Sequence, residues 1–187
     1  MILLINNQSK LLPKLENFLK NNKVDYKIFT NDEKINFKKL PKIKGVILSG
    51  GPGTPEGPLD LKNNFYILKN IKVPILGICL GHEIIGYFFG AKFAKLKIKQ
   101  DKIEHIYIKK NDPIFAGLKN YINLRECHNY YLTTCPKKFE ILAYSNICPI
   151  EALKHKTLPI WALQSHPEDS GKDGKTILKN FLKICQK

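Results

Sequence analysis

The sequence predicts an α/β fold in three layers: an open, mostly parallel sheet with helices on both faces, plus a small antiparallel layer. Two observations support this fold class. In the first half of the chain, short apolar runs alternate with segments whose apolar residues recur at helical spacing. In the second half, strand-like segments follow one another with short connections, which is typical of antiparallel strands.

The first half contains four expected strands separated by helices. The strands are expected at residues 2–5, 26–30, 45–49 and 73–78. Helices are expected at residues 11–19, 61–68 and 84–89, with a short helix in the polar segment 31–44. Continuous apolar runs such as residues 2–5 are typical of strands that are buried on both faces of a parallel sheet. The β-α-β-α order therefore predicts parallel strands with helices on both sides.

The second half contains shorter strand-like segments and one helix. The strands are expected at residues 105–108, 121–124, 139–144, 150–153 and 160–163, and the C-terminal helix at 177–184. No linker, repeat or low-complexity segment interrupts the chain. We therefore expect a single domain that spans residues 1–187.

The composition favours a folded protein with a lysine-rich surface. The chain carries 31 Lys and Arg against 16 Asp and Glu, a formal net charge of +15. The lysines are spread along the chain, Arg125 is the one arginine, and no RNA-recognition signature or zinc finger is present. We expect no nucleic-acid partner. An acidic protein partner is the next interpretation of the charge.

The cysteines and the N-terminal residues indicate a cytoplasmic protein without a membrane segment. Residues 1–7 lack the basic start and the length of a signal peptide, and no apolar run is long enough to span a membrane. The five cysteines are an odd number and are scattered along the chain. We expect them to be reduced thiols in the cytoplasm.

Cys79 is the candidate nucleophile. It lies between Gly77 and Gly81, at the junction of a buried strand and a helix. This pattern indicates a nucleophile elbow, in which glycines allow a sharp turn that lifts the thiol out of the sheet. The N-terminus of the helix is expected to lower the pKa of the thiol and to favour the thiolate. A buried structural cysteine is the alternative interpretation.

A glycine-rich loop follows the expected strand at residues 45–49. It matches neither a dinucleotide-binding fingerprint nor a P-loop. Because the loop and Cys79 both follow parallel strands, we expect them at the same edge of the sheet, where ligands bind. Backbone N–H groups of the loop and of Leu80 can then form an oxyanion hole. The Gly and Pro content of residues 50–58 predicts a weakly held loop.

His166 is the best candidate for the base that a cysteine nucleophile needs. It follows the expected strand at 160–163, and Glu168 lies two residues further on. In an extended segment these two side chains face the same side, so Glu168 can accept from one ring nitrogen while the other faces Cys79. Structural roles are expected for three other histidines: His82, His105 and His155.

Three segments together resemble class I glutamine amidotransferases. They are Ser-Gly-Gly-Pro-Gly at 49–53, Gly-Ile-Cys-Leu-Gly-His-Glu at 77–83 and Ser-His-Pro-Glu at 165–168, and they occur in the family's order. Residues 146–155 are similar to the glutaminase part of GMP synthetases, and no ATP-binding pyrophosphatase region follows residue 168. The chain therefore resembles the separate glutaminase subunit of an archaeal-type, two-chain GMP synthetase.

The resemblance implies glutamine hydrolysis by a Cys-His-Glu triad. Cys79 would attack the side-chain amide and give a glutamyl thioester and ammonia. His166 would take the proton of the thiol and protonate the leaving ammonia, and Glu168 would orient His166. Gly51 and Leu80 would supply the oxyanion-hole N–H groups.

Two positions depart from the family pattern. The family's substrate-binding Gln is replaced by Glu83, whose carboxylate can accept a hydrogen bond from the substrate's ammonium group but cannot donate one. A Ser/Asn-His-Gly segment of many relatives corresponds to residues 127–129. The substrate-binding residues that the resemblance implies are Gly53, Glu83, Cys127, Asn129 and Tyr130.

The implied partners are L-glutamine and an ATP-pyrophosphatase (synthetase) subunit that aminates XMP to GMP. ATP and Mg would bind to the partner. No metal or cofactor is expected in this chain, because Cys127, His128, Cys135 and Cys148 lack paired Cys-x-x-Cys spacing. Two alternatives stay open: the glutaminase subunit of another synthase, of the anthranilate or aminodeoxychorismate type, and a weakly active subunit that binds or regulates its partner.

Overall fold

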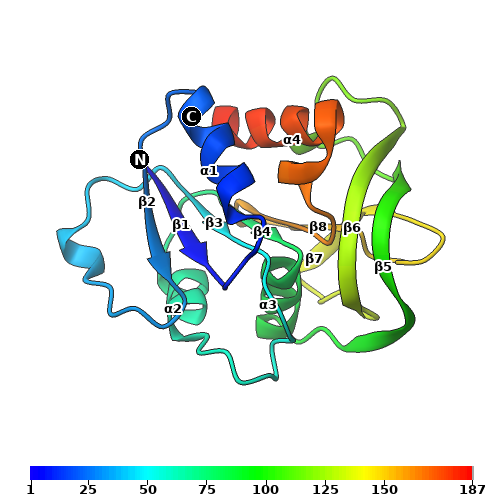
Figure 1. The fold of residues 1–187 in the computed structure, drawn as a ribbon, viewed down its shortest axis with the longest axis horizontal. Helices are drawn as coiled ribbons and strands as arrows, with labels where there is room; N and C mark the ends of the chain where they lie inside the picture. Colours follow the sequence, from blue (N-terminus) through cyan, green and yellow to red (C-terminus); the bar gives the residue numbers. More distant parts are fainter. Residues whose placement is uncertain (187) are drawn as a thin grey trace.

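A nine-stranded mixed sheet in the order β2-β1-β3-β4-β9-β8-β7-β5-β6 forms the centre of the computed structural model, which describes residues 1–186 (Figure 1). The strands are β1 (Ile2–Asn6), β2 (Tyr26–Thr30), β3 (Gly45–Leu48), β4 (Ile75–Ile78), β5 (Phe93–Ile108), β6 (Tyr121–Leu132), β7 (Phe139–Tyr144), β8 (Ala152–His155) and β9 (Ile160–Leu163). The helices are α1 (Leu12–Asn21), α2 (Lys62–Asn70), α3 (Leu80–Phe88) and α4 (Gly171–Ile184), with 3-10 helices η1 (Phe37–Lys39), η2 (Pro113–Phe115) and η3 (Pro167–Asp169).

The first part of the sheet is parallel, as predicted. β1 pairs with β2 and β3, and β3 pairs with β4, all in parallel. β4 also pairs in parallel with β9, which differs from the expectation that residues 160–163 belong to the antiparallel strands. The carboxyl ends of these strands therefore lie at one edge of the sheet. Four residues that directly follow them meet at this edge: Asn7, Ser49, Cys79 and Gln164.

Side chains of the parallel strands alternate between two hydrophobic cores, one on each face of the sheet. Ile2 and Leu4 of β1 belong to the core that includes α1 and α4. Leu3 and Ile5 belong to the core that includes α2 and α3. Figure 1 shows the two helix pairs on opposite sides of the sheet. The predicted three-layer arrangement is confirmed.

The antiparallel part continues the same sheet instead of forming a layer of its own. β9 pairs with β8 and β8 with β7, and β7 reaches the long β5–β6 hairpin through two residue pairs, Tyr107 with Tyr144 and Ile108 with Ala143. At its other side, β6 approaches the loop after β9, because Arg125 forms an antiparallel bridge with His166. The antiparallel strands thus curve back toward the carboxyl ends of the parallel strands (Figure 1).

The β5–β6 hairpin is much longer than the sequence predicts. Strands are expected only at residues 105–108 and 121–124, whereas β5 has 16 residues and β6 has 12. Most side chains of β5 are exposed or half-buried, so this strand lacks the apolar pattern that marks a buried strand. β6 does alternate between buried side chains and more exposed ones, but polar Glu126 and His128 fill its buried positions after Leu124 and end the apolar pattern. Cross-strand hydrogen bonds between polar segments form the hairpin, and these depend on pairing that sequence periodicity does not report.

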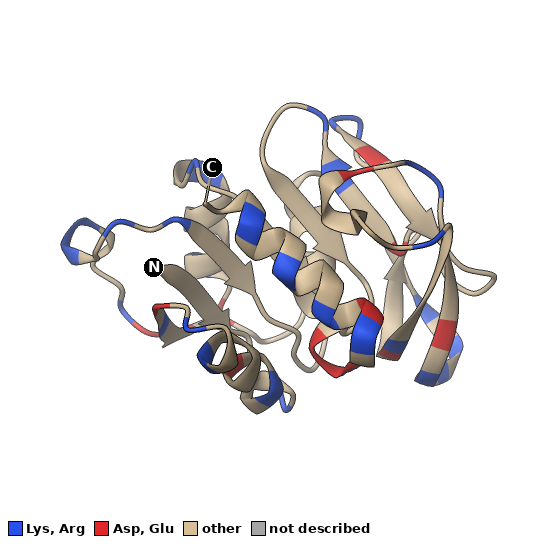
Figure 2. Ribbon diagram, turned by 90° about the horizontal axis from the view of Figure 1, so that it is seen from above, with Lys and Arg blue, Asp and Glu red and all other residues tan. Residues whose placement is uncertain are grey.

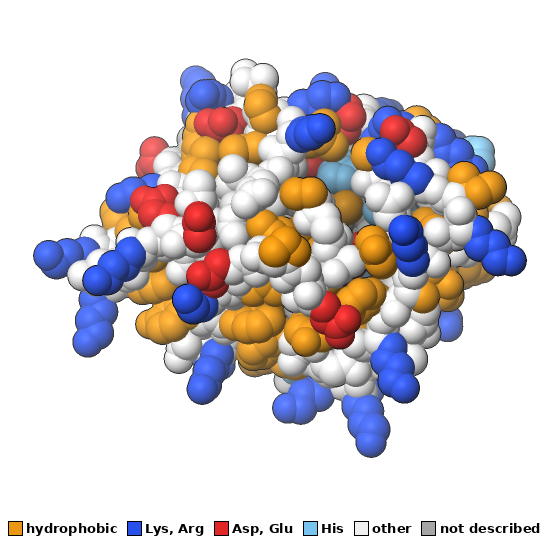
Figure 3. Space-filling view, turned by 60° about the horizontal axis from the view of Figure 1, so that its bottom comes forward, with side chains coloured by type: hydrophobic (Ala, Val, Ile, Leu, Met, Phe, Trp, Pro, Cys, Tyr) orange, Lys and Arg blue, Asp and Glu red, His pale blue; other side chains and the backbone are white. Residues whose placement is uncertain are grey.

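The positive charge is dispersed, as predicted. Figure 2 marks Lys and Arg positions on helices, strands and loops, and Figure 3 shows Lys and Arg side chains spread over the face in view without one dominant patch. Across the described residues, no helix combines the length and the apolar character that crossing a membrane requires.

Candidate active site

A pocket of about 300 Å³ lies at the carboxyl edge of the parallel strands. Residues from six segments line it: Gln8, Ser9, Lys10 and Leu11 after β1; Gly51, Pro52 and Gly53 after β3; Cys79, Leu80 and Glu83 around the start of α3; Lys99 of β5; Cys127, His128, Asn129 and Tyr130 of β6; and His166 after β9. The face in Figure 3 has a hollow with histidine atoms in it. Three of these six segments follow β1, β3 and β4, which the sequence predicts to be parallel strands.

Cys79 occupies the predicted elbow between β4 and α3. Its backbone has φ 51° and ψ −107°, and so a non-glycine residue takes the left-handed conformation. Gly77 and Gly81 were predicted to allow the sharp turn, but the structure shows that they allow close packing instead. A Cβ on Gly77 would lie 2.5 Å from the carbonyl oxygen of Gly81, and one on Gly81 would lie 2.2 Å from that of Leu48. The glycines let α3 approach the sheet, while Cys79 itself makes the turn.

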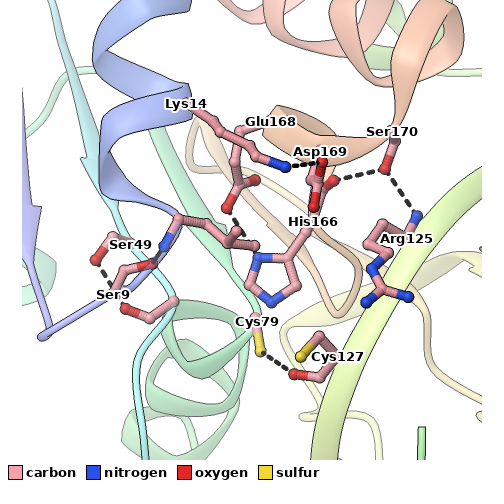
Figure 4. Close-up of polar contacts among 12 residues, drawn as sticks. Ser9, Lys14, Ser49, Cys79, Arg125, Cys127, His166, Glu168, Asp169 and Ser170 are labelled. Atoms are coloured by element: carbon pink, nitrogen blue, oxygen red, sulfur yellow. Dashed lines mark hydrogen bonds and ion pairs between the residues drawn. The ribbon is translucent and has the colours of Figure 1, made fainter. Parts of the chain in front are cut away.

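His166 and Glu168 face Cys79 from the loop that follows β9. Nδ1 of His166 lies 2.8 Å from Oε1 of Glu168, and both side chains are buried. The other ring nitrogen, Nε2, points toward the sulfur of Cys79 (Figure 4). The predicted extended geometry is wrong, because residues 167–169 form the 3-10 helix η3. The short helix nevertheless brings Glu168 back onto the imidazole of His166.

The charges of the thiol and the imidazole depend on each other. Burial raises the pKa of the Cys79 thiol, although attraction and hydrogen bonding to His166 counteract this effect. Burial lowers the pKa of His166, but the Cys79 thiolate and then Glu168 outweigh it and raise the pKa to about 11. The direction for Cys79 is opposite to the prediction from the helix N-terminus. Burial disfavours both the Cys79 thiolate and the His166 imidazolium, and each of the two charges stabilises the other.

The turn that contains His166 is held against β6. The His166 N–H donates to the carbonyl of Arg125 at 2.8 Å. The Ser170 hydroxyl donates to the carbonyl of His166 at 2.5 Å and accepts from the Arg125 N–H at 2.8 Å (Figure 4). Lys14 of α1 forms an ion pair with Asp169 of η3. These contacts orient the base from two sides.

The glycine loop begins in a fixed position. The Asn7 side chain donates to the Ser49 carbonyl at 2.9 Å, and its oxygen accepts from Asn64 at 2.9 Å. A Cβ on Gly51 would lie 1.8 Å from the Asn7 carbonyl oxygen, so the loop packs directly on the end of β1. The prediction of a weakly held loop is therefore wrong for its first residues, because a buried amide network replaces the missing apolar contacts.

The β6 segment that contains Cys127, Asn129 and Tyr130 forms the opposite wall of the pocket. Sγ of Cys79 lies 3.9 Å from the carbonyl oxygen of Cys127 (Figure 4). His128 is buried, and its Nε2 lies 2.8 Å from Oε2 of Glu126. All predicted substrate-binding residues line the pocket, and Glu168 lies behind His166.

Two groups of pocket residues were not predicted. Residues 8–11 connect β1 to α1, and Lys99 belongs to β5. The first group follows a predicted parallel strand, and this position could have indicated that the group lies at the ligand-binding edge of the sheet. Nothing in the sequence indicated that Lys99 would line the pocket, because it lies in the polar part of β5, where no strand was expected.

Three histidines lie outside the catalytic arrangement. His82 is buried in α3, and its Nδ1 contacts the Gln164 side-chain oxygen at 3.1 Å. His155 is buried against Phe89 and Phe139 and accepts from the Leu158 N–H at 3.0 Å. His105 of β5 packs edge-on against Tyr121. In residues 1–186, no cluster of three or more His, Cys, Asp or Glu side chains is arranged to hold a metal ion.

Comparison with known proteins identifies the family. The model of the family "Glutamine amidotransferase class-I" matches residues 3–185. The chain belongs to the class I glutamine amidotransferases. Full-length relatives include a glutamine-hydrolyzing GMP synthase subunit of Methanococcus aeolicus, with 37% identity over 99% of this chain and 97% of the relative. The protein of the same name from Methanocaldococcus jannaschii is also 37% identical, with the same two coverages.

Solved structures agree with this family assignment. A protein of Thermoplasma acidophilum, described as a GMP synthase subunit, is 32% identical and superposes with a TM-score of 0.90. The superposition covers 99% of this chain and 93% of that protein. A glutamine amidotransferase of Thermotoga maritima is 16% identical, and its TM-score of 0.83 over 100% of this chain and 98% of its own shows the shared fold.

Proposed function

We propose that this chain is the glutaminase subunit of a two-chain GMP synthase, which hydrolyses L-glutamine and delivers ammonia to a synthetase subunit. The observation that supports the chemistry most directly is the arrangement of Cys79, His166 and Glu168 at the pocket. The full-length relatives named as glutamine-hydrolyzing GMP synthase subunits support the biological role.

The first half of the reaction forms a covalent intermediate. His166 takes the proton of the Cys79 thiol as the sulfur attacks the carbon of the glutamine side-chain amide. The carbonyl oxygen becomes an oxyanion, and the backbone N–H groups of Gly51 and Leu80 donate to it. Leu80 is suited to this role, because it begins α3 and its N–H has no partner within the helix. The C–N bond then breaks, and the His166 imidazolium protonates the leaving nitrogen to give ammonia.

The second half releases glutamate. A water molecule replaces ammonia, and the neutral His166 removes a proton from it as its oxygen attacks the thioester carbon. The C–S bond breaks, and the thiol is restored with the proton from His166. Glu168 accepts from Nδ1 throughout, so Nε2 faces the reacting atoms in both halves. The walls of the pocket, from β6 and from residues 8–11, hold the rest of the glutamine.

The experiment combines the chain with the synthetase subunit of a two-chain GMP synthase and measures GMP formed from XMP and ATP·Mg²⁺. Glutamine is expected to support the reaction with the wild-type chain. The Cys79→Ala variant is expected to lose glutamine-dependent synthesis and to retain synthesis from added ammonia, because only the nucleophile is missing. The matched control is Cys135→Ala, since this half-buried thiol lies outside the pocket.

The outcomes separate the alternatives. Substantial glutamine hydrolysis by Cys79→Ala would exclude Cys79 as the nucleophile. Ammonia transfer to a chorismate-using synthase, and none to the XMP-aminating subunit, would favour the anthranilate type of enzyme. A folded wild-type chain that hydrolyses no glutamine in either complex would favour a subunit with a binding or regulatory role.

A further inference from the structure

Glu83 is a buried acid in the wall of the active-site pocket. It lies one turn of α3 after the nucleophile, where its N–H donates to the Cys79 carbonyl at 3.1 Å. The residue is only 2% exposed and lines the pocket beside Cys79. A carboxyl group in this position is desolvated before any substrate binds, so its hydrogen-bond partners decide its charge.

One oxygen of Glu83 already has a donor, and the other has none. The Gln164 amide nitrogen donates to Oε1 of Glu83 at 3.3 Å. The orientation of this amide follows from His82, whose Nδ1 contacts the Gln164 oxygen at 3.1 Å. Burial lowers the pKa of His82 to about 3, so this imidazole is neutral and donates from Nδ1. Oε2 of Glu83 is buried without a hydrogen-bond partner.

Glu83 forms no ion pair among the described residues, and the hydrogen bond from Gln164 and the attraction of His128 lower its pKa by less than burial raises it. Its own helix presents the neutral His82, and β6 presents His128, whose pKa is also lowered by burial. The Cys79 thiolate on the adjacent elbow repels an ionised Glu83. The positive groups that line the same pocket, the His166 imidazolium, Lys10 and Lys99, form no ion pair with it. Burial therefore raises the pKa of Glu83 to about 7.

We propose that Glu83 binds glutamine as a neutral carboxylic acid, which donates a hydrogen bond from its protonated carboxyl group to an acceptor oxygen of the substrate. This inference rests on the proposed glutaminase function. It corrects the expectation that a glutamate at this position can only accept, because a protonated carboxyl has one O–H donor. Both the side-chain amide and the α-carboxylate of glutamine offer oxygens that match such a donor.

Ionisation of Glu83 removes this interaction. The carboxylate has no proton to donate, and its charge repels both the substrate carboxylate and the thiolate of Cys79. Glutamine binding is therefore expected to weaken as the pH rises above about 7. An amide at this position would donate at every pH, so Glu83→Gln is expected to bind glutamine independently of pH in this range.

The experiment measures the Kd of glutamine by calorimetry, with the full chain in a Cys79→Ala background that binds without turnover. Between pH 6 and pH 8.5, Kd is expected to stay constant at first and then to rise up to about tenfold per pH unit, as release of one proton requires. The double variant with Glu83→Gln is expected to have a flat profile. Glu140 is a surface acid paired with Lys110, and the double variant with Glu140→Gln is expected to show the same dependence of Kd on pH as the Cys79→Ala background.

The result that overturns the inference differs from the one that overturns the proposed function. A flat Kd profile in the background variant, or an equal slope after Glu83→Gln, excludes the neutral acid as the donor while the chain still binds glutamine. Absence of glutamine binding in every folded variant at every pH removes the glutaminase function and this inference with it.

Discussion

Close packing around single residues determines how the nucleophile is presented. Cys79 adopts a positive φ of 51°, a conformation that costs a non-glycine residue about 1–3 kcal/mol. The conformation persists because β4 and α3 are both held in the core, with Gly77 and Gly81 too close to their neighbours for a side chain. The strain directs the thiol toward His166, and helix packing keeps it there.

Replacement of Glu168 tests the orienting role proposed for it. Glu168→Gln is expected to lower kcat by several powers of ten, because an amide can place the wrong tautomer of His166 against Cys79. The pKa of His166 is expected to fall, since Glu168 is one of the groups that raise it. His166→Ala is expected to lower kcat further. Rate profiles against pH for both variants check this order, and negligible effects of both would indicate a different base.

Gly51→Ala tests the oxyanion hole. The new Cβ would collide with the Asn7 carbonyl, so the loop must shift and its N–H must move. Loss of one such donor is expected to lower kcat by about 10²–10³. The matched control is Gly90→Ala, which also adds a Cβ but has open space around it at a positive φ, outside the pocket. It is expected to lose stability and to retain kcat. Equal kcat in both variants would contradict the role of Gly51.

At the scale of elements, the catalytic turn depends on a strand from the other part of the sheet. η3 follows β9, yet the two residues that flank it, His166 and Ser170, hydrogen-bond with Arg125 of β6. β6 also brings the Cys127 carbonyl to the sulfur of Cys79. One strand thus contacts the nucleophile, the base and the substrate pocket, and its position matters to all three.

Ser170→Ala tests the connection between η3 and β6. The substitution leaves the Arg125 N–H without its partner, and one such unmet group costs about 1–3 kcal/mol. The His166 carbonyl loses one of its two donors and keeps the Asp169 N–H. Misplacement of His166 is expected to lower kcat by up to ~10² as well. Thermal unfolding and steady-state rates measure both effects. The control Thr176→Ala removes an exposed bond within α4 and is expected to change neither. An unchanged kcat in Ser170→Ala would show that η3 keeps its position without this contact.

At the scale of the whole molecule, buried acids make stability depend on pH. Burial raises the pKa of Glu126 to about 8 and that of Glu151 well above its usual range. The folded chain therefore holds protons that the unfolded chain releases above the usual carboxyl pKa of 4.5. By linkage, each such group makes the free energy of unfolding fall as the pH rises through this window.

Glu126→Gln tests this dependence. The Tm of the wild-type chain is expected to fall between pH 5 and pH 8, because ionisation of Glu126 is favoured only in the unfolded chain. The fall is expected to be smaller in Glu126→Gln, which has no proton to release at this position. Glu83 and Glu151, whose pKa values burial also raises, contribute to the remainder. Glu140→Gln is the control, since the pKa of this exposed acid is lowered and its titration lies below the window. Identical slopes for all three proteins would contradict the buried-acid explanation.

The sequence by itself determined the parallel half of the fold and the positions of the triad. Strands buried on both faces require continuous apolar runs, and residues at their carboxyl ends must meet at one edge. Local pattern is sufficient here. It was enough to single out Cys79, His166 and the loop that contains Gly51.

Only the tertiary structure decided the features that arise from contacts between distant segments. β5 is mostly polar and exposed, and so its pairing with β6 and the bridge between Arg125 and His166 leave no periodic signal. The 3-10 turn of Glu168 differs from the extended segment that its spacing indicates. The raised pKa of Glu83 follows from burial, which outweighs the opposite effects of the hydrogen bond from Gln164 and the attraction of His128. Desolvation depends on every element that packs around a group, and for that reason the spacing of residues along the chain does not report it.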